Sequence, residues 1–251
     1  MSNEPYFEFN GQSSLQHRMT FLDDIYFVSP ETALQFEEVD ARQGSLVYSE
    51  NRYKDIRKIF PVEIQRQNDQ SLMQQLQTIN RWIKEPKNYQ PFFLSLNPNY
   101  MYQAICYEEI TIADQSKDWM DIRIPFRFAP VMYSIDGLQP RSIQSGIQLE
   151  NPELEIAYPL IQFHYNATSD ATLSIGGRQY RILRSAGTGL FTIDSENGLA
   201  YREGNINLSS SILIHTDGYH PPILNPGLTT ITFTNQLTNV RITPRWRAIA
   251  I

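Results

Sequence analysis

The sequence predicts a mainly β protein of two domains, with one helix in the first domain. Three observations carry this prediction: apolar and polar residues alternate along most of the chain, glycine-containing pairs separate short alternating runs in the second half, and one stretch has helical spacing. The chain has 251 residues, of which 41% are hydrophobic and 12% aromatic, enough to bury a substantial core. We place the two domains at residues 1–142 and 143–251.

The clearest strand in the first domain lies at residues 120–128. Apolar side chains occupy every second position there, and charged residues or proline lie between them, as in a strand with one buried face. The same alternation occurs at residues 60–64 and 102–108. Residue Cys106 shares the parity of its apolar neighbours, so we expect it to be a small core residue.

Residues 70–84 have the spacing of an amphipathic helix. The expected apolar stripe consists of Leu72, Met73, Leu76, Ile79, Trp82 and Ile83. We expect Asn68 or Asp69 to cap the first turn and Pro86 to end the helix. The opposite face, which includes Gln75 and Gln77, is expected to lie toward solvent or a wet interface.

The second domain is predicted to be a β-sandwich. Residues 134–151 contain glycine, proline and polar residues and resemble a connection between domains. Beyond them, Gly176-Gly177 and Asn197-Gly198 each lie between alternating runs, and both pairs accept the positive φ of a two-residue hairpin turn. Asp217-Gly218 is expected to form a third turn, and residues 231–233 and 240–242 the last strands.

Composition excludes several classes of protein. The net charge of −6 argues against a protein that holds nucleic acid through phosphate contacts. No stretch approaches the roughly 20 apolar residues of a membrane helix, so we expect no membrane insertion. Residues 1–9 lack a signal-peptide pattern, and a single cysteine allows neither an intramolecular disulfide nor a multi-cysteine metal site. These features favour synthesis in a reducing compartment.

We predict no enzyme activity, no cofactor and no metal site. The sequence has no nucleophile-elbow, zinc-protease or P-loop motif. His215 and His220 flank Asp217, but a metal site would need a third ligand from elsewhere, and polar turn residues explain them more simply. Adjacent carboxylates such as Glu108 and Glu109 point to opposite faces of a strand and cannot form a glycosidase pair.

Several segments of the first domain resemble the distal tail proteins (Dit) of siphophages, the bacteriophages with long non-contractile tails. Residues 7–11 resemble the family's opening strand and turn. Residues 42–44 with Tyr53 resemble its "G-R-x-G … Y" hairpin, with Ala41 in place of the first glycine. Residues 79–83 resemble its "I-x-x-W-L" helix. The later matches are Tyr100–Ala104 and the strand Phe126–Pro130 with Tyr133, which resembles an "F-x-C-x-P-x-x-Y" exit from the first domain.

The second half continues the resemblance. Residues 193–196 with Tyr201 resemble the family's "I-D … Y" hairpin. Pro226-Gly227, residues 231–233 and residues 242–247 resemble its "P-G-x-N-x-I-x-F … P-R-W-R" ending, with threonine where asparagine is usual. The pieces are short, but they follow the family's order and spacing along nearly the whole chain.

The resemblance implies a tail-tube-like β-sandwich with one flanking helix for the first domain and a galectin-like β-sandwich for the second. It also implies a homo-hexameric ring, single or stacked as a double ring, around a central channel for DNA. The ring would join the major tail (tube) protein and the tape-measure protein to the tail-associated lysin. Its outer domains would anchor receptor-binding or baseplate proteins for host adsorption. The protein would lie at the distal end of the tail in the virion, after assembly in the host bacterial cytoplasm.

A hairpin spanning residues 42–53 is our candidate for the contact between subunits, because it is mostly polar and poor in core residues. A closed ring needs heterologous contacts that repeat from one subunit to the next. The expected contact residues are Arg42, Leu46, Val47, Tyr48 and Tyr53. The alternative is a solvent-exposed flap. Six copies would carry a formal charge of −36, so a channel through them would not hold passing DNA by phosphate neutralisation, and we expect no stable nucleic-acid binding.

Two other functions compete with the hub. A carbohydrate- or receptor-binding baseplate protein would use Trp82, Trp119 or Trp246 as a stacking surface, but the tryptophans are scattered and packing explains them more simply. The His-Asn-Pro-Arg and Trp-Gly-x-Glu segments that galectins use for sugar are absent. A two-domain β-sandwich glycosidase lacks an identifiable carboxylate pair.

Overall fold

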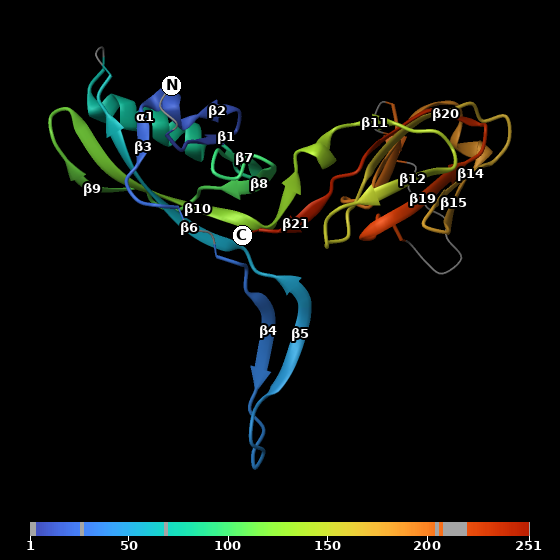
Figure 1. Cartoon of the computed structure of the whole chain (residues 1–251), viewed down its shortest axis with the longest axis horizontal. Coiled ribbons are helices and arrows are strands. Elements are labelled where there is room, and N and C mark those ends of the chain that lie inside the picture. Colours follow the sequence, from blue (N-terminus) through green and yellow to red (C-terminus); the bar gives the residue numbers. More distant parts are fainter. Residues whose placement is uncertain (1–3, 26–27, 68–69, 204–205, 208–219, 251) are drawn as a thin grey trace. The chain divides into compact units, whose positions relative to one another are not determined.

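The structure is a computed structural model of the chain, drawn in Figure 1. It describes residues 4–25, 28–67, 70–203, 206–207 and 220–250. The chain divides into two compact units, Met1–Met132 with Ile249–Ile251, and Tyr133–Ala248. The second unit is therefore an insertion, because the chain leaves the first unit after Met132 and returns to it at Ile249.

The division lies before the expected boundary at residue 143. The residues immediately after Met132 bind partners in the second unit: the N–H of Ser134 donates to the carbonyl of Trp246 at 2.9 Å, and Arg141 pairs with Ile242. These hydrogen bonds lie within the segment that composition marks as a connection. Its glycine and polar residues form turns that belong to the second unit.

A nine-stranded sheet builds most of the first unit, with the path β2-β1-β7-β8-β10-β6-β3 and with β9 and β21 also paired to β10. Its strands are β1 (Phe7–Phe9), β2 (Gln12–Ser13), β3 (Met19–Phe21), β6 (Ile56–Gln65), β7 (Gln90–Leu94), β8 (Tyr100–Ile105), β9 (Thr111–Gln115), β10 (Trp119–Ser134) and β21 (Arg247–Ile249). Two of the strands predicted from alternation, 60–64 and 120–128, lie within β6 and β10. The third, 102–108, overlaps β8 only as far as Ile105, so Cys106 and Glu108 lie beyond the strand.

The sheet curls around an aromatic core. In a flat sheet β1 and β10 would be about 14 Å apart, because two strands lie between them. The rings of Phe7 and Phe126 are nevertheless 5.8 Å apart, and those of Phe9 and Phe126 5.2 Å apart. Phe60, Phe92 and both β1 phenylalanines are fully buried in the same core. The curl thus lets one sheet enclose its own hydrophobic interior.

Helix α1 (Leu72–Lys84) lies against β1 and begins two residues later than expected. Ser71 caps it, in a reciprocal capping box with Gln74; the expected caps Asn68 and Asp69 lie outside the described residues. Trp82 is buried as predicted and its Nε1 donates to the carbonyl of Phe9 at 2.9 Å. Met73, which we expected in the apolar stripe, is exposed.

Gln75 also differs from the prediction. It lies on the face expected to meet solvent, yet it is buried, and its Nε2 donates to the carbonyls of His17 at 2.9 Å and Gln65 at 3.1 Å. Its Oε1 accepts the N–H of Gln67 at 3.2 Å. An uncharged glutamine can fill such a position because its amide satisfies backbone groups on both sides.

The second unit is a β-sandwich, as predicted. One sheet has the order β11-β20-β13-β16-β17-β18 and the other β12-β19-β14-β15. The strands are β11 (Arg141–Ser142), β12 (Ile147–Asn151), β13 (Leu160–Tyr165), β14 (Ala171–Ile175), β15 (Arg178–Ile182), β16 (Gly189–Asp194), β17 (Leu199–Arg202), β18 (Ile206–Asn207), β19 (Gly227–Phe233) and β20 (Leu237–Thr243). Buried residues of both sheets, such as Phe163, Phe191, Leu173 and Tyr180, form one core between them.

Both predicted hairpins of this unit are present, but only the first has a two-residue turn, because residues 195–198 all lie between β16 and β17. Gly176 and Gly177 join β14 to β15 with φ values of 58° and 83°. Gly198, with φ 62°, lies in the turn between β16 and β17. The turn expected at Asp217-Gly218 lies outside the described residues.

Candidate functional site

A two-stranded arm, β4 (Thr32–Glu37) and β5 (Leu46–Tyr53), extends away from the sheet of the first unit, as Figure 1 shows. Among the strands that the structure describes, these two pair only with each other. The register pairs Phe36 with Val47 and Gln35 with Tyr48. Residues 42–53, expected to form the whole hairpin, supply only the turn and β5; the partner strand β4 precedes them.

The arm has one apolar face. Residues opposite each other on antiparallel strands project from the same face, and successive residues alternate between faces. Leu34, Phe36 and Val47 therefore share a face, and all three are exposed, Phe36 at 68% of its surface. A ribbon of two strands is marginal in water by itself, so an uncovered apolar face along it indicates a surface that binds another protein.

The opposite face of the arm is polar and aromatic. Gln35, Glu37, Leu46, Tyr48 and Glu50 project from it. Gln35 Nε2 donates to Glu50 Oε1 at 3.0 Å, and Arg52 lies 2.6 Å from the other oxygen of Glu50. The hydrogen bond from Gln35 and the contact with Arg52 lower the pKa of Glu50 below its ordinary value. Glu50 thus belongs to a polar network with Gln35 and Arg52 on this face.

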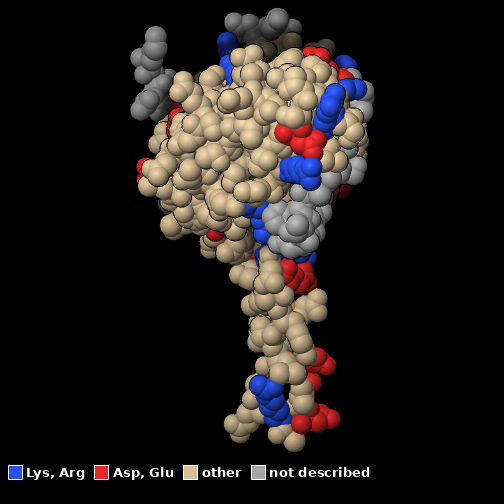
Figure 2. Space-filling view, turned by 90° about the vertical axis from the view of Figure 1, so that its right-hand side faces the viewer, with Lys and Arg blue, Asp and Glu red and all other residues tan. Residues whose placement is uncertain are grey.

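The tip and the base of the arm are ordered by backbone contacts. At the tip, Ala41 and Gly44 have φ values of 61° and 83°, and the N–H of Arg42 donates to the carbonyl of Val39 at 3.1 Å. At the base, the N–H of Lys54 donates to the carbonyl of Glu31 at 2.8 Å. Figure 2 shows that uncharged side chains dominate the visible length of the arm, with charges of both signs gathered near its tip.

The five residues predicted to make the subunit contact do not share one surface. Val47 lies on the apolar face, whereas Leu46 and Tyr48 lie on the opposite face; Arg42 is in the tip, and Tyr53 is near the base, opposite Thr32. Leu34 and Phe36 were not among the residues predicted to make the contact. Their position on one face of a strand could have been predicted, because they alternate with Ala33, Gln35 and Glu37.

A polar network in the second unit joins two of the segments that resemble distal tail proteins. Nη1 of Arg245 lies 2.6 Å from Asp194 Oδ1 and 3.4 Å from Glu196 Oε2. Asn197 Nδ2 donates to Asp194 Oδ2 at 2.8 Å, and the Tyr133 hydroxyl donates to Glu196. Because its carboxylates are engaged by Arg245, Asn197 and Tyr133, the network has the character of a structural brace.

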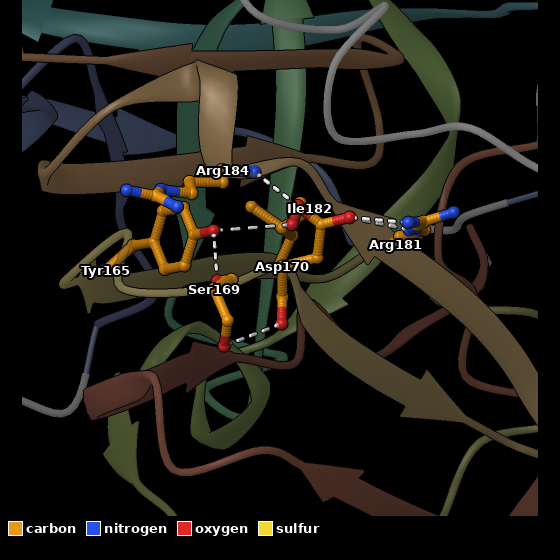
Figure 3. Close-up of polar contacts among 6 residues, drawn as sticks. All are labelled: Tyr165, Ser169, Asp170, Arg181, Ile182 and Arg184. Atoms are coloured by element: carbon orange, nitrogen blue, oxygen red, sulfur yellow. Dashed lines mark hydrogen bonds and ion pairs between the residues drawn. The ribbon is translucent and has the colours of Figure 1, made fainter.

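A second brace lies where β13, β14 and β15 meet, as Figure 3 shows. Asp170 accepts the backbone N–H of Arg184 at 2.7 Å and two donors of Arg181 at 2.5 and 3.0 Å. These contacts, the Arg184 N–H first, lower the pKa of Asp170 below its ordinary value. The Tyr165 hydroxyl donates to the carbonyl of Ser169 at 2.8 Å. Together they fix the loop after β13 against the end of β15.

Cys106 and Trp246, two of the residues considered for chemistry, occupy structural positions. Cys106 is buried, and burial raises the pKa of its thiol to about 11, as suits a core residue. Trp246 is buried beneath the Arg141 guanidinium, 4.6 Å from the ring centroid, so it offers no open face to a sugar. His220 is exposed, and His215 and Asp217 lie outside the described residues. Among the residues described, no three His, Cys, Asp or Glu side chains are grouped to hold a metal ion.

Helix length gives one further finding. No helix in the described part of the chain is both long and apolar enough to span a membrane.

The comparisons with known proteins identify the fold. No protein-family model and no curated protein matches the sequence. Among solved structures, the Dit protein of phage SPP1, described as a paradigm of hub adsorption apparatus in phages that infect Gram-positive bacteria, superposes with a TM-score of 0.70 at 12% identity, over 95% of this chain and 96% of that one. A chain from the phage P2 baseplate in its activated conformation with Ca superposes with a TM-score of 0.52 at 9% identity, over 96% and 97%. The likeness spans both units, and it confirms at the level of the fold the resemblance found in the sequence: this chain has the fold of a phage Dit hub protein.

Proposed function

We propose that this protein is a structural hub of a phage tail tip or baseplate. In this proposal six copies form a ring, single or stacked as a double ring, around a central channel for DNA. The ring joins the tail tube and tape-measure proteins to the tail-associated lysin. The likeness to phage SPP1 Dit and to a phage P2 baseplate chain supports this role.

The arm β4–β5 is the observation that carries the proposal. In a ring, each subunit offers one surface to the subunit ahead and a different one to the subunit behind. An arm that leaves its own sheet is suited to reach the next subunit. Covering Leu34, Phe36 and Val47 there would contribute about 1.5–3 kcal/mol for each side chain fully buried. We infer that the apolar face of the arm makes this contact, with Arg42 at its tip and Tyr53 near its base. Leu46 and Tyr48 project from the opposite face of the arm and would take part only if both faces are covered.

The remaining parts of the proposal follow from charge and from the second unit. Six copies carry a formal charge of −36, which disfavours stable binding of DNA in the channel. The second unit, residues 133–248, would anchor receptor-binding or baseplate proteins during host adsorption. The protein would act at the distal end of the virion tail, after assembly in the bacterial cytoplasm, and without catalysis or a cofactor.

A mass measurement tests the ring and the arm together. Light scattering on the purified chain should give six times the 29.1 kDa mass of one copy, or a double of that, and negative-stain images should contain rings with a central hole. Phe36→Asp should shift the mass to that of a single chain, because a carboxylate cannot be buried without a partner. Met73→Asp is the matched control: Met73 is similarly exposed but lies on α1, so this variant should stay hexameric.

Two outcomes would overturn these inferences separately. A wild-type chain that stays monomeric at all concentrations contradicts the ring. A ring that persists in Phe36→Asp, and also when residues 33–52 are replaced by a short glycine-serine linker, contradicts the arm as the contact. Polysaccharide binding by a monomeric chain would favour the carbohydrate-binding alternative.

A further inference from the structure

The most exposed large apolar side chain in the described part of the chain is Leu154, at 90% of its surface. It lies in the loop that follows β12 in the second unit, between Glu153 and Glu155. Leaving a leucine in water forgoes the roughly 1.5–3 kcal/mol that its burial provides. A single exposed leucine on a mobile loop would mean little, so the order of this loop decides its significance.

Asn151, the last residue of β12, fixes the loop from inside. It is buried, and its Oδ1 accepts the N–H of Glu153 at 3.1 Å. Its Nδ2 donates to the carbonyls of Glu155 at 3.0 Å and Leu224 at 3.3 Å. The Asn151 amide therefore holds the backbone on both sides of Leu154. It also joins the loop to the neighbouring segment that contains Leu224.

Hydrogen bonds also fix the end of the loop, at Ile156 and Ala157. Ala157 is fully buried and exchanges two backbone hydrogen bonds of 2.9 Å with Leu224. The carbonyl of Ile156 accepts Nε of Arg247 at 2.7 Å. Because the loop is preorganised, little conformational entropy would be lost when a partner covers Leu154.

The segment that contains Leu154 is acidic, and the strand paired with β12 carries a second exposed leucine. Leu228, the first exposed residue beyond the glycine that starts β19, is exposed at 67% and pairs directly with Glu150 across the β12–β19 ladder. Glu150, Glu153 and Glu155 supply three carboxylates, and no lysine or arginine occurs in residues 142–177. The basic residue at the base of the loop, Arg247, is already engaged with Ile156 and with the Tyr158 ring.

We propose that this loop, with Leu154 as its apolar anchor and Glu150 and Glu155 at its rim, docks into an apolar pocket rimmed by lysine or arginine on a different protein of the virion. The proposal rests on the hub function and names the surface of the second unit that serves it. The acidic rim selects a basic protein surface and repels anionic polymers and anionic lipid headgroups. An anchor side chain contributes most to binding when it is fully desolvated in a pocket and the contacts around it exclude water.

Site-specific cross-linking in the virion tests the docking. A phage that lacks its own copy of the gene is supplied with the chain carrying a photo-reactive amino acid at position 154. The matched control carries it at Leu190, an exposed leucine of β16 in the other sheet. Irradiated virions are then analysed by mass spectrometry. We expect position 154, and not position 190, to cross-link to a virion protein other than this chain, at a peptide that contains lysine or arginine.

A second variant tests the rim. Glu150→Gln with Glu155→Gln should lower the yield of the cross-link from position 154 by about tenfold, because two attractive charges are lost while Leu154 remains. Equal thermal melting of the variant and the parent chain will show that the fold is retained. An unchanged yield overturns the charge-selected partner.

The remaining outcomes are distinct from each other. Virions that contain the chain but give no cross-link from position 154, or only links between copies of this chain, overturn the docking and leave the ring intact. Virions from which the chain is absent overturn the hub function, and the docking with it.

Discussion

Arg245 and Asp194 form an ion pair that is largely withdrawn from water. Their closest atoms are 2.6 Å apart, and the side chains are exposed at only 19% and 13%. Arg245 also has a φ of 55°, a left-handed conformation that is uncommon for residues other than glycine. The surrounding contacts hold this conformation, which places the guanidinium against Asp194 and Glu196.

Arg245→Ala should therefore lower the free energy of unfolding of the second unit by about 3 kcal/mol, because it leaves two partly buried carboxylates without their cation. Arg241→Ala, which removes an exposed arginine of β20, should change it by no more than about 0.5 kcal/mol. Chemical denaturation followed by tryptophan fluorescence measures both. Equal small effects would mean that the ion pair contributes nothing to the fold.

The pair also predicts a dependence on pH. Burial alone would raise the pKa of Asp194, but hydrogen bonds from Asn197 and Arg245 outweigh burial and hold the pKa below its ordinary value of 3.8. A carboxyl whose pKa is lowered by folding stabilises the fold above its unfolded pKa and loses this effect as the pH falls through its folded pKa. As the pH is lowered from 6 to well below 3.8, the free energy of unfolding should fall more steeply for the parent chain than for Asp194→Asn, which has no proton to bind, and the difference should develop mainly below pH 3.8.

Three carboxylates lie side by side on the outer face of the first unit. They predict that ionisation of the central carboxyl destabilises the fold, the opposite of the effect at Asp194. Asp121 of β10 is paired directly with Glu63 of β6 and with Asp114 of β9. Partial burial, followed by the negative charges of Glu63 and Asp114, raises the pKa of Asp121 above its ordinary value. Asp121→Asn should therefore stabilise the first unit by up to about 1 kcal/mol at pH 7, since like charges opposite each other are destabilising.

The gain from Asp121→Asn should disappear below pH 3.8, where Asp121 is protonated in both the folded and the unfolded chain. Asp40→Asn, which removes a negative charge from the tip of the arm, is the control for net charge. A gain of the same size in Asp40→Asn would assign the effect to net charge and not to the carboxylate row.

The buried glutamine of α1 gives a prediction with a control on the same helix. Gln75→Ala should cost about 1–3 kcal/mol, because it leaves the carbonyls of His17 and Gln65 and the N–H of Gln67 without their partner. Gln77→Ala, two positions along and exposed, should be neutral or slightly stabilising because alanine is the better helix former. Thermal unfolding of the two variants compares them directly.

The sequence predicted those parts of the fold that repeat a local pattern. The strands of β6, β8 and β10, the stripe of α1 and the glycine hairpins of the second unit each follow from the geometry of a few consecutive residues. Gln75 could not be predicted, because its burial depends on backbone groups of His17 and Gln65 that are distant in sequence. The same holds for Asn151, whose amide acts on Leu224.

The candidate contact was predicted only in part. The turn at Ala41–Gly44 was included only because residues 42–44 with Tyr53 resemble the hairpin of the distal tail proteins. The apolar face was missed because Phe36 and Val47 are neighbours only through the β4–β5 register. A register cannot be obtained from alternation alone, since a slip of one residue exchanges the two faces.

The insertion of the second unit has a consequence for folding. The N–H of Ala250 donates to the carbonyl of Pro130 at 2.9 Å, a contact of the first unit that spans the whole inserted segment in sequence. Closing so long a loop in a disordered chain costs roughly 4 kcal/mol of entropy. Once the second unit has folded, the Ser134–Trp246 hydrogen bond already holds the two ends of the loop close together. Residues 133–248 are synthesised before Ala250. Folding of the second unit can therefore bring the two ends of the loop together before the Ala250–Pro130 hydrogen bond of the first unit forms.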